Sequence, residues 1–186
     1  CVSTGWRFAQ QDLHQTLRDA RERYYFDGPA RHNLCISHRR RILLNRQLNK
    51  AFLPDRVVPT FIRAKPKKGQ MCAAQNLFIW PGIELLGCVQ ATRKGIRNNV
   101  LYRITALGEE SATLMIAQGE GDPLELTYPQ VAEWLRLSFA QTYASVQGTE
   151  FSETLRCHDV TNPHFTRRHL FVAMSRAKEC SKLAIA

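Results

Sequence analysis

The sequence predicts an α/β domain that is interrupted by a small β-rich module. An apolar strand over residues 33–37 runs directly into an amphipathic helix over 38–52, which is the strand-to-helix unit of a parallel sheet. From Leu77 to Tyr128, short β runs follow one another between Gly and Asn turns, as in a small antiparallel barrel or sheet. Because the α/β pattern returns after residue 130, the β-rich stretch is expected to be an insertion.

The remaining segments are assigned from hydrophobic periodicity and from turn residues. An amphipathic helix is predicted over 9–25 and ends at the Asp27-Gly28-Pro29 turn. In the helix over 38–52, the expected inward contacts are Ile42, Leu44, Leu48 and Phe52. The other predicted elements are strands over 57–62 and 155–160, a short helix over 129–135, a strand after Leu137, a helix over 165–177 and a last strand over 182–186.

The charge of the chain indicates a polyanionic partner. Its 26 Lys and Arg residues exceed its 16 Asp and Glu residues, which leaves a net charge of +10. Nucleic acid is favoured over an acidic membrane because no basic amphipathic helix with a large apolar face is present. No apolar run approaches the roughly 20 residues that span a bilayer, so no membrane partner is expected. A basic surface that is merely solvated is the alternative.

The cysteines are expected to be buried thiols, not a disulfide framework or a zinc site. None forms a C-x-x-C pair and several lie in apolar runs. The chain shows no signal peptide, and we expect no metal site. These features predict an intracellular, reducing compartment, which is the cytoplasm, the nucleus or a viral replication site.

Three arginines, Arg39, Arg40 and Arg41, lie where the strand over 33–37 meets its helix. A helix N-terminus repels cations, so three arginines in the first turn suggest that an anion is bound there. The alternative is that these long side chains extend into water at little cost.

Two segments near the end of the chain carry a family resemblance. Gln147-Gly-Thr-Glu-Phe151 follows an apolar strand, and His169-Leu-Phe-Val-Ala-Met-Ser-Arg-Ala-Lys178 forms an amphipathic helix. Together they resemble motifs V and VI of superfamily 1 DNA helicases, whose usual forms are T-x-H-K-x-Q-G-x-E-F and Y-V-A-L-S-R-A. The alternatives are that the first is an ordinary turn and that the arginine of the second, Arg176, is a surface residue near a helix end that pairs with a carboxylate.

The resemblance assigns roles to these residues. Arg176 would be an arginine finger for the γ-phosphate of ATP, with Phe171, Ala173 and Met174 packed around it. The residues expected near the nucleotide are Gln147, Gly148 and Glu150. Thr142 would contact the DNA backbone. The usual His and Lys of motif V are Ala144 and Ser145 here, so a DNA contact at Ser145 would be weakened.

Two further segments resemble the same helicases. The strand over 33–37 and its helix resemble motif IV, in which a basic residue reaches the phosphates of the nucleotide. Arg39 is the first choice for that residue and Arg40 the second. The stretch over 77–128 resembles the SH3-like subdomain of RecD-like and Dda-like helicases. Trp80 in it could stack on a base, although most aromatic residues of a small barrel form its core.

The resemblance implies a RecA-like parallel sheet flanked by helices, with an inserted SH3-like β-barrel. The predicted boundaries are 1–72 and 131–186 for the RecA-like lobe and 73–130 for the module. The chain has neither a Gly-Lys dipeptide of a phosphate loop nor an Asp-Glu pair. ATP and Mg²⁺ are therefore expected to be bound mainly by an N-terminal helicase lobe outside this sequence, and single-stranded DNA is the expected partner. The alternative is a non-catalytic, basic nucleic-acid-binding module.

Overall fold

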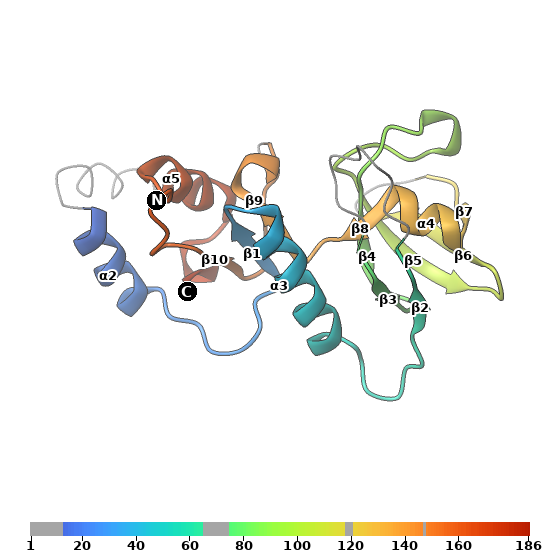
Figure 1. The fold of residues 1–186 in the computed structure, drawn as a ribbon, viewed down its shortest axis with the longest axis horizontal. Coiled ribbons are helices and arrows are strands. Elements are labelled where there is room, and N and C mark those ends of the chain that lie inside the picture. Colours follow the sequence, from blue (N-terminus) through green and yellow to red (C-terminus); the bar gives the residue numbers. More distant parts are fainter. Residues whose placement is uncertain (1–12, 65–74, 118–120, 147) are drawn as a thin grey trace. The chain divides into compact units, whose positions relative to one another are not determined.

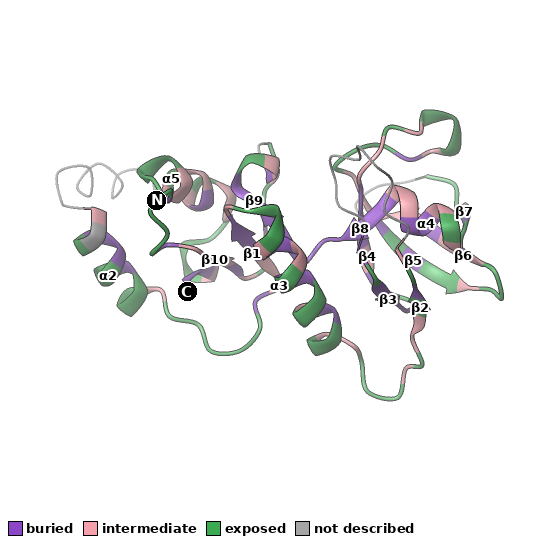
Figure 2. Cartoon of the chain, viewed as in Figure 1, coloured by how far each residue is buried: buried purple, intermediate pink, exposed green. Residues whose placement is uncertain are grey.

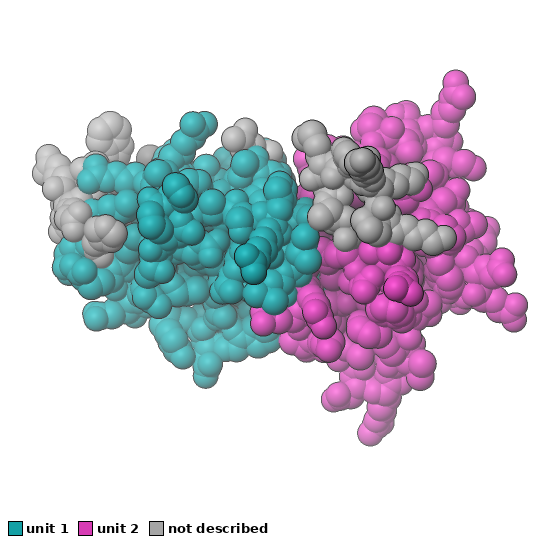
Figure 3. Space-filling view, viewed as in Figure 1, with its two compact units in different colours: residues 1–44, 139–186 teal, residues 45–138 magenta. Residues whose placement is uncertain are grey.

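The computed structural model describes residues 13–64, 75–117, 121–146 and 148–186 (Figure 1). It consists of two compact units, coloured separately in Figure 3. Unit 1 contains residues 1–44 and 139–186, and unit 2 contains residues 45–138. The boundary between them falls inside helix α3 (His38–Ala51).

Unit 1 is built on a four-stranded sheet with the strand order β11-β10-β1-β9. Every neighbouring pair in this sheet is parallel. The strands are β1 (His32–Cys35), β9 (Ala140–Thr142), β10 (Leu155–Cys157) and β11 (Leu183–Ile185). The parallel α/β architecture predicted from the sequence is therefore confirmed. All four strands end at the same edge of the sheet, which is where ligands of open α/β sheets usually bind.

Helices cover the apolar surface of this sheet. Helix α2 (Leu13–Arg23) packs against β11, and α5 (Arg167–Arg176) packs against β10 and the 3-10 turn η2 (Tyr143–Val146). Thr166 caps α5, because its backbone N–H donates to His169 Nδ1 at 3.0 Å and the two residues form a capping box. In Figure 2 the strands of unit 1 are buried, while the outer sides of its helices are exposed.

The buried side of α3 differs from the predicted one. Leu44 is buried as expected, but Ile42, Leu48 and Phe52 are only half-buried, and Arg41, Asn45 and Asn49 are buried instead. Asn49 is hydrogen-bonded to the backbone of Phe78 in the same polypeptide. Its Nδ2 donates to Phe78 O at 2.9 Å, and Phe78 N donates to its Oδ1 at 2.8 Å. Hydrophobic periodicity misses this face because a carboxamide with both hydrogen-bonding groups satisfied can be buried.

Unit 2 contains a five-stranded antiparallel sheet with the order β7-β6-β5-β4-β8 and a separate two-stranded ribbon, β2-β3. The large sheet is formed by β4 (Glu84–Gly87), β5 (Leu101–Leu107), β6 (Ser111–Ile116), β7 (Leu124–Thr127) and β8 (Leu135–Leu137). The ribbon is formed by β2 (Thr60–Ile62) and β3 (Leu77–Ile79). The predicted antiparallel sheet is confirmed, but a closed SH3-like barrel is not shown, since β7 and β8 stand at the edges of the sheet within the described residues.

The limits of unit 2 lie outside the predicted module of 73–130. The ribbon joins residues on both sides of the predicted start, because β2 pairs with β3. The predicted helix over 129–135 is α4 (Tyr128–Trp134), and it leads into β8, which pairs with β4 before the chain reaches β9. Pairing between strands that are distant in the sequence thus extends the unit to 45–138.

Gly87 is required where β4 meets the following loop. Its N–H donates to Val100 O at 2.8 Å and its carbonyl accepts from Asn99 N at 2.9 Å. A Cβ atom on Gly87 would lie 2.2 Å from Arg97 O, which is backbone that cannot easily move away. Gly87→Ala is therefore expected to lower the free energy of unfolding by about 1–3 kcal/mol in urea titrations. Gly108→Ala is the control, since its Cβ would meet nothing closer than 3.5 Å. Equal stability of the two variants would contradict this account.

Most described cysteines agree with the prediction of thiols. Cys35, Cys88 and Cys157 are free, and burial raises the pKa of both Cys35 and Cys157 to about 12, which makes them unreactive thiols. Cys180 is exposed and disulfide-bonded, so the prediction of a buried thiol is wrong there. Within the described ranges, no helix has the length and apolar character needed to cross a membrane.

Candidate nucleotide and nucleic-acid site

The turn that resembles motif V and the helix that resembles motif VI are joined through their backbones. Phe151 N donates to Arg176 O at 2.8 Å, and Lys178 N donates to Phe151 O at 3.0 Å. These bonds form a parallel bridge between Phe151 and Ala177. Glu150, which precedes Phe151, is consequently brought near the end of α5 that carries Arg176, although the two residues are far apart in the sequence.

The guanidinium of Arg176 is available for a ligand. Its Nε donates to Ser175 Oγ at 3.4 Å, and Ser175 in turn donates to Val172 O at 3.0 Å. Among the described residues Arg176 forms no ion pair, so the carboxylate partner of a purely structural arginine is not found. The side chain itself is half-buried at the C-terminal end of α5.

The residues around Arg176 differ in part from the prediction. Ala173 is buried and Met174 is half-buried against the core of unit 1. Phe171 is exposed, so its predicted place in the packed surround is wrong. Residues two apart on a helix point about 200° away from each other, and the burial of Ala173 therefore turns Phe171 outward.

The turn before Phe151 has open space at a left-handed glycine, where a phosphate or a sugar could approach the backbone. Gly148 has φ +82° and open space at its Cβ position. Thr149 N donates to Val146 O at 3.1 Å and closes the turn. Glu150 is exposed, and Gln147 lies outside the described residues. Gly148, Glu150 and Arg176 thus form one neighbourhood, called here the Arg176 cluster.

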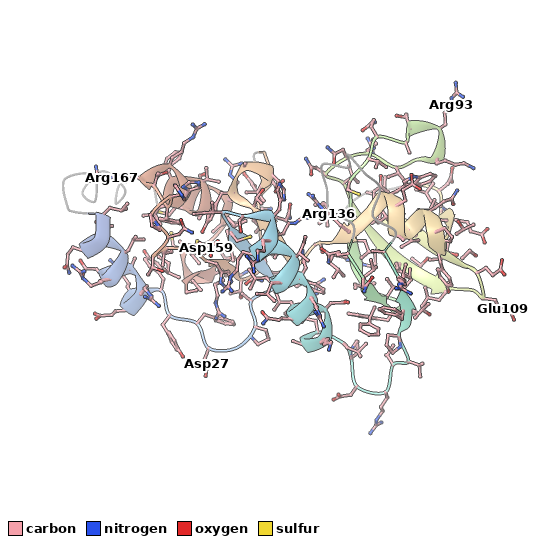
Figure 4. The ribbon with its side chains drawn as sticks, viewed as in Figure 1. Asp27, Arg93, Glu109, Arg136, Asp159 and Arg167 are labelled. Atoms are coloured by element: carbon pink, nitrogen blue, oxygen red, sulfur yellow. The ribbon has the colours of Figure 1, made fainter. Side chains whose placement is uncertain are left out.

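The three arginines at the start of α3 have separate environments. Arg39 is exposed, Arg40 is half-buried and Arg41 is 1% exposed. Ser37 Oγ accepts from Arg40 N at 3.1 Å and caps the helix. Asp159, labelled in Figure 4, places its Oδ1 3.8 Å from Arg40 Nε. A carboxylate of the chain itself therefore faces Arg40 at this junction, and the bound anion suggested by the sequence stays a prediction.

Asp159 also fixes the loop that follows β1. Its Oδ2 accepts a hydrogen bond from Ile36 N at 2.9 Å, and its own backbone is left-handed with φ 62°. Because Ile36 comes directly after β1, Arg39 and Arg40 lie at the carboxyl end of that strand.

The Arg176 cluster lies toward the opposite end of β1. The ring of Phe151 packs on the ring of His32, the first residue of β1, with 4.5 Å between the ring centroids. From His32 to Ile36 an extended chain advances about 13 Å. The structure therefore separates the predicted nucleotide-binding residues into two groups, with Arg39 and Arg40 in one and the Arg176 cluster in the other.

The residues predicted to contact DNA do not form an open surface. Thr142, at the end of β9, is 7% exposed. Ser145 Oγ donates to Thr142 O at 2.9 Å and accepts from Thr142 N at 3.2 Å, so its hydroxyl serves a local turn. Trp80 is 4% exposed. Its ring belongs to the core of unit 2, which was the alternative to base stacking, and it offers no face to a base in this structure.

A buried polar network behind the carboxyl edge was not anticipated from the sequence. His158 Nε2 lies 2.9 Å from Asn33 Oδ1, while Asn33 Nδ2 donates to Ala30 O and Phe139 O at 2.9 and 3.0 Å. Asn33 therefore uses its oxygen as an acceptor, and His158 donates from Nε2. Tyr143 Oη donates to His158 O at 2.9 Å. The network links β1, η2 and the end of β10. In the sequence, its only indication was the presence of polar residues within apolar strands.

Burial explains the protonation state of this network. It lowers the pKa of His158 to about 4, with nearby Arg40 and Arg156 acting in the same direction and Asp159 opposing them. Burial also raises the pKa of the Tyr143 phenol. Both groups are therefore neutral near pH 7. In the described part of the chain, no group of three or more His, Cys, Asp or Glu side chains is arranged to hold a metal ion.

Unit 2 presents an ordered basic loop over residues 91–97. Arg93, Lys94 and Arg97 in it are all exposed, and Figure 4 shows Arg93 projecting from the unit. Tyr102 Oη accepts from Arg97 N at 2.8 Å and donates to Gly95 O at 2.9 Å, which fixes the loop from inside. The order of this loop depends on a tyrosine that lies on the following strand, β5.

Comparison with known proteins reveals similarity at the level of structure. No protein-family model matches this sequence, and no curated protein matches it. A structure concerned with DNA unwinding at forked double-stranded DNA by two coordinating Pif1 helicases aligns with a TM-score of 0.62 and 19% identity, over 92% of this chain and 41% of that one.

Two further Pif1 structures align over the same share of this chain. The Pif1 helicase from Bacteroides in complex with ADP-AlF3 and single-stranded DNA has a TM-score of 0.62 and 18% identity, over 92% of this chain and 44% of its own. The Pif1 helicase from Candida albicans has a TM-score of 0.59 and 14% identity, over 92% of this chain and 49% of its own.

The alignments cover less than half of each of those three chains. This chain spans from 41% to 49% of the length of those three chains. The likeness agrees with the α/β fold expected from the sequence, while membership of superfamily 1 and of its RecD-like and Dda-like branch stays a prediction. The chain is thus similar in fold to a part of these Pif1 helicases.

Proposed function

We propose that this chain is a motor-lobe part of an ATP-dependent superfamily 1 DNA helicase that moves on single-stranded DNA. The observation that carries the proposal is the backbone pairing of Phe151 with Arg176 and Lys178. This pairing joins the end of the helix to the turn that contains Gly148 and Glu150, which supports a phosphate-sensing role for Arg176. The fold likeness to Pif1 helicases supports the same conclusion.

The residues of the Arg176 cluster fit a nucleotide. A guanidinium with no carboxylate partner among the described residues can donate hydrogen bonds to phosphate oxygens, and the left-handed Gly148 leaves open space beside the turn. ATP would supply the phosphoryl group, and Arg176 would hold its oxygens as negative charge shifts during transfer. Glu150 would contact the sugar. Mg²⁺ and the remaining phosphate contacts are assigned to an N-terminal lobe, because no phosphate loop occurs in this sequence.

Of the two arginines at the carboxyl end of β1, Arg39 and Arg40, only one is proposed as the first choice for a phosphate contact. Arg40 already faces Asp159, and the phosphate role falls first to the exposed Arg39. For DNA, the exposed cations of the basic loop are better placed than Thr142, Ser145 or Trp80, because they can reach phosphates without a change in the core. We therefore propose that the loop over 91–97 contacts the DNA backbone.

Binding of the chain to single-stranded DNA is expected to be weak and steeply salt-dependent. The net charge of +10 acts through counterion release, and each phosphate contact contributes about 0.7 to the slope of log K against log salt. Replacing Arg93, Lys94 and Arg97 by Gln should reduce that slope by about 2 in fluorescence-anisotropy titrations. The matched control replaces Arg18, Arg21 and Arg23 of α2, an equal loss of charge. Salt-independent binding, or equal slopes for both variants, would contradict the proposal.

The second candidate is a non-catalytic nucleic-acid-binding module. Two observations favour it. Thr142 is buried and the hydroxyl of Ser145 is hydrogen-bonded to the backbone of Thr142, and the usual His and Lys of motif V are replaced by Ala144 and Ser145. The two candidates differ in one measurable property. A full-length protein that contains this chain should hydrolyse ATP faster when single-stranded DNA is added if it is a helicase, and should show no ATP turnover if it is a binding module.

A further inference from the structure

The β2-β3 ribbon of unit 2 has one buried and one exposed face. In its register, Phe61 lies opposite Phe78, and Ile62 lies opposite Leu77. Side chains alternate between faces along a strand, and Ile62, Leu77 and Ile79 are all buried. The exposed face therefore carries Phe61 and Phe78, and beside them Arg63 and Asn76.

The two phenylalanine rings form a continuous aromatic surface. Their centroids lie 5.1 Å apart with an interplanar angle of 46°. Phe61 is 52% exposed and Phe78 is half-buried. A cross-strand aromatic pair is usually a core contact, but here the core is on the other face of the ribbon. The ring of Phe61 is thus among the exposed large hydrophobic side chains of the described residues.

The surface is held rigidly in place. Asn49, which is 2% exposed, exchanges two hydrogen bonds with the backbone of Phe78. At the far end of the ribbon, Ala64 N donates to Asn76 Oδ1 at 2.9 Å and continues the pairing beyond β2. Because both strands are fixed, a flat ligand could pack on the rings without an ordering cost in the protein.

The charge around the rings favours a nucleic acid over an apolar peptide. Arg63 is exposed and follows Phe61 on the same face. The ribbon and its described flanks, residues 59–64 and 75–80, include no Asp or Glu. An aromatic surface beside a guanidinium and an amide matches an unpaired base and its phosphate. An apolar peptide would leave Arg63 without a counter-charge.

We propose that Phe61 and Phe78 form a stacking platform for an unpaired base of single-stranded nucleic acid, with Arg63 at the adjacent phosphate. This inference rests on the proposed function, since it adds a base contact to a DNA-binding chain. Stacking is independent of base identity, because every base has a π face, and the platform would therefore bind without sequence preference.

The test compares two probes of equal charge: a fluorescent oligothymidylate of about 16 nucleotides and an abasic oligonucleotide of the same length. Phe61→Ala should weaken binding of the complete 186-residue chain to oligothymidylate by about 5- to 150-fold and leave binding to the abasic probe unchanged. Phe171→Ala removes an exposed ring from α5 and is the matched control, with no effect expected on either probe.

A second variant covers the case in which Phe61→Ala fails to fold. Phe61→Trp keeps an aromatic face, so it should retain the wild-type affinity and gain fluorescence that oligothymidylate quenches more than the abasic probe does. Equal affinities of wild type and Phe61→Ala for oligothymidylate would overturn the platform alone. A wild-type chain that binds neither probe would overturn the proposed function together with it. Self-association that Phe61→Ala abolishes, with DNA binding unchanged, would reassign the rings to a contact between copies.

Discussion

Replacing Arg176 by Ala in the full-length protein is expected to lower ATP turnover by about 10³- to 10⁵-fold and to leave DNA binding near normal. The guanidinium is permanently ionised and donates two parallel hydrogen bonds, so it can stabilise the negative charge on the oxygens of the transferred phosphoryl group. The methyl group of alanine can do neither. The fold should tolerate the change, because the bond that joins this position to Phe151 uses the backbone carbonyl of Arg176 and not its side chain.

The control for this substitution is Arg168→Ala on the same helix. Arg168 is exposed on the first turn of α5, so its removal changes the net charge equally without touching the Arg176 cluster. Arg176→Lys should recover little turnover, since an ammonium lacks the forked geometry. Steady-state ATP hydrolysis with single-stranded DNA present is the measurement. Wild-type turnover in Arg176→Ala, or an equal loss in Arg168→Ala, would remove Arg176 from the proposed site.

Acidification from about pH 6.5 to about pH 4 is expected to destabilise the fold by an amount on the order of 3 kcal/mol through His158 alone. Burial lowers the pKa of His158 in the folded chain from its ordinary 6.5 to about 4. Between these two pH values the unfolded chain binds the proton and the folded chain does not. Stability is therefore fully present above pH 6.5 and falls as the pH approaches 4.

Urea unfolding at a series of pH values measures this effect. His158→Gln should flatten the pH dependence in that window, although it should also lower stability at pH 7 because the bond to Asn33 Oδ1 is altered. His164→Gln is the control, since His164 is exposed and lies outside the network. If wild type and His158→Gln keep a constant difference in stability from pH 7 to pH 4, the titration of His158 does not control the acid sensitivity.

Secondary structure followed from local patterns along most of the chain. The strand and helix over 33–52, the short β runs after Leu77 and the final helix all appear close to their predicted positions. The exceptions are informative. The limits of unit 2 differ from those of the predicted module because β2 and β8 pair with strands distant in the sequence. The barrel was expected because short β runs do not reveal whether the edges of a sheet meet.

The candidate site was predictable in composition but not in arrangement. Motif resemblance singled out Arg176, Gly148 and Glu150, and the backbone bridge at Phe151 brings them together. It also grouped Arg39 and Arg40 with them, whereas the structure places those two at the other end of β1 and pairs Arg40 with Asp159. Nothing local to Asp159 indicates that partner, because the contact joins segments more than a hundred residues apart.

By itself, the sequence determined the parallel α/β class, the antiparallel character of the β-rich stretch, the basic charge and the identity of the arginine near the end of α5. These properties depend on periodicity and composition, which are local. Only the tertiary structure decided that Trp80 is core, that Asn49 and His158 are buried partners, and that Phe61 and Phe78 share an exposed face. Each of these depends on which backbone or ring lies opposite, and that is set by strand register and packing between distant segments.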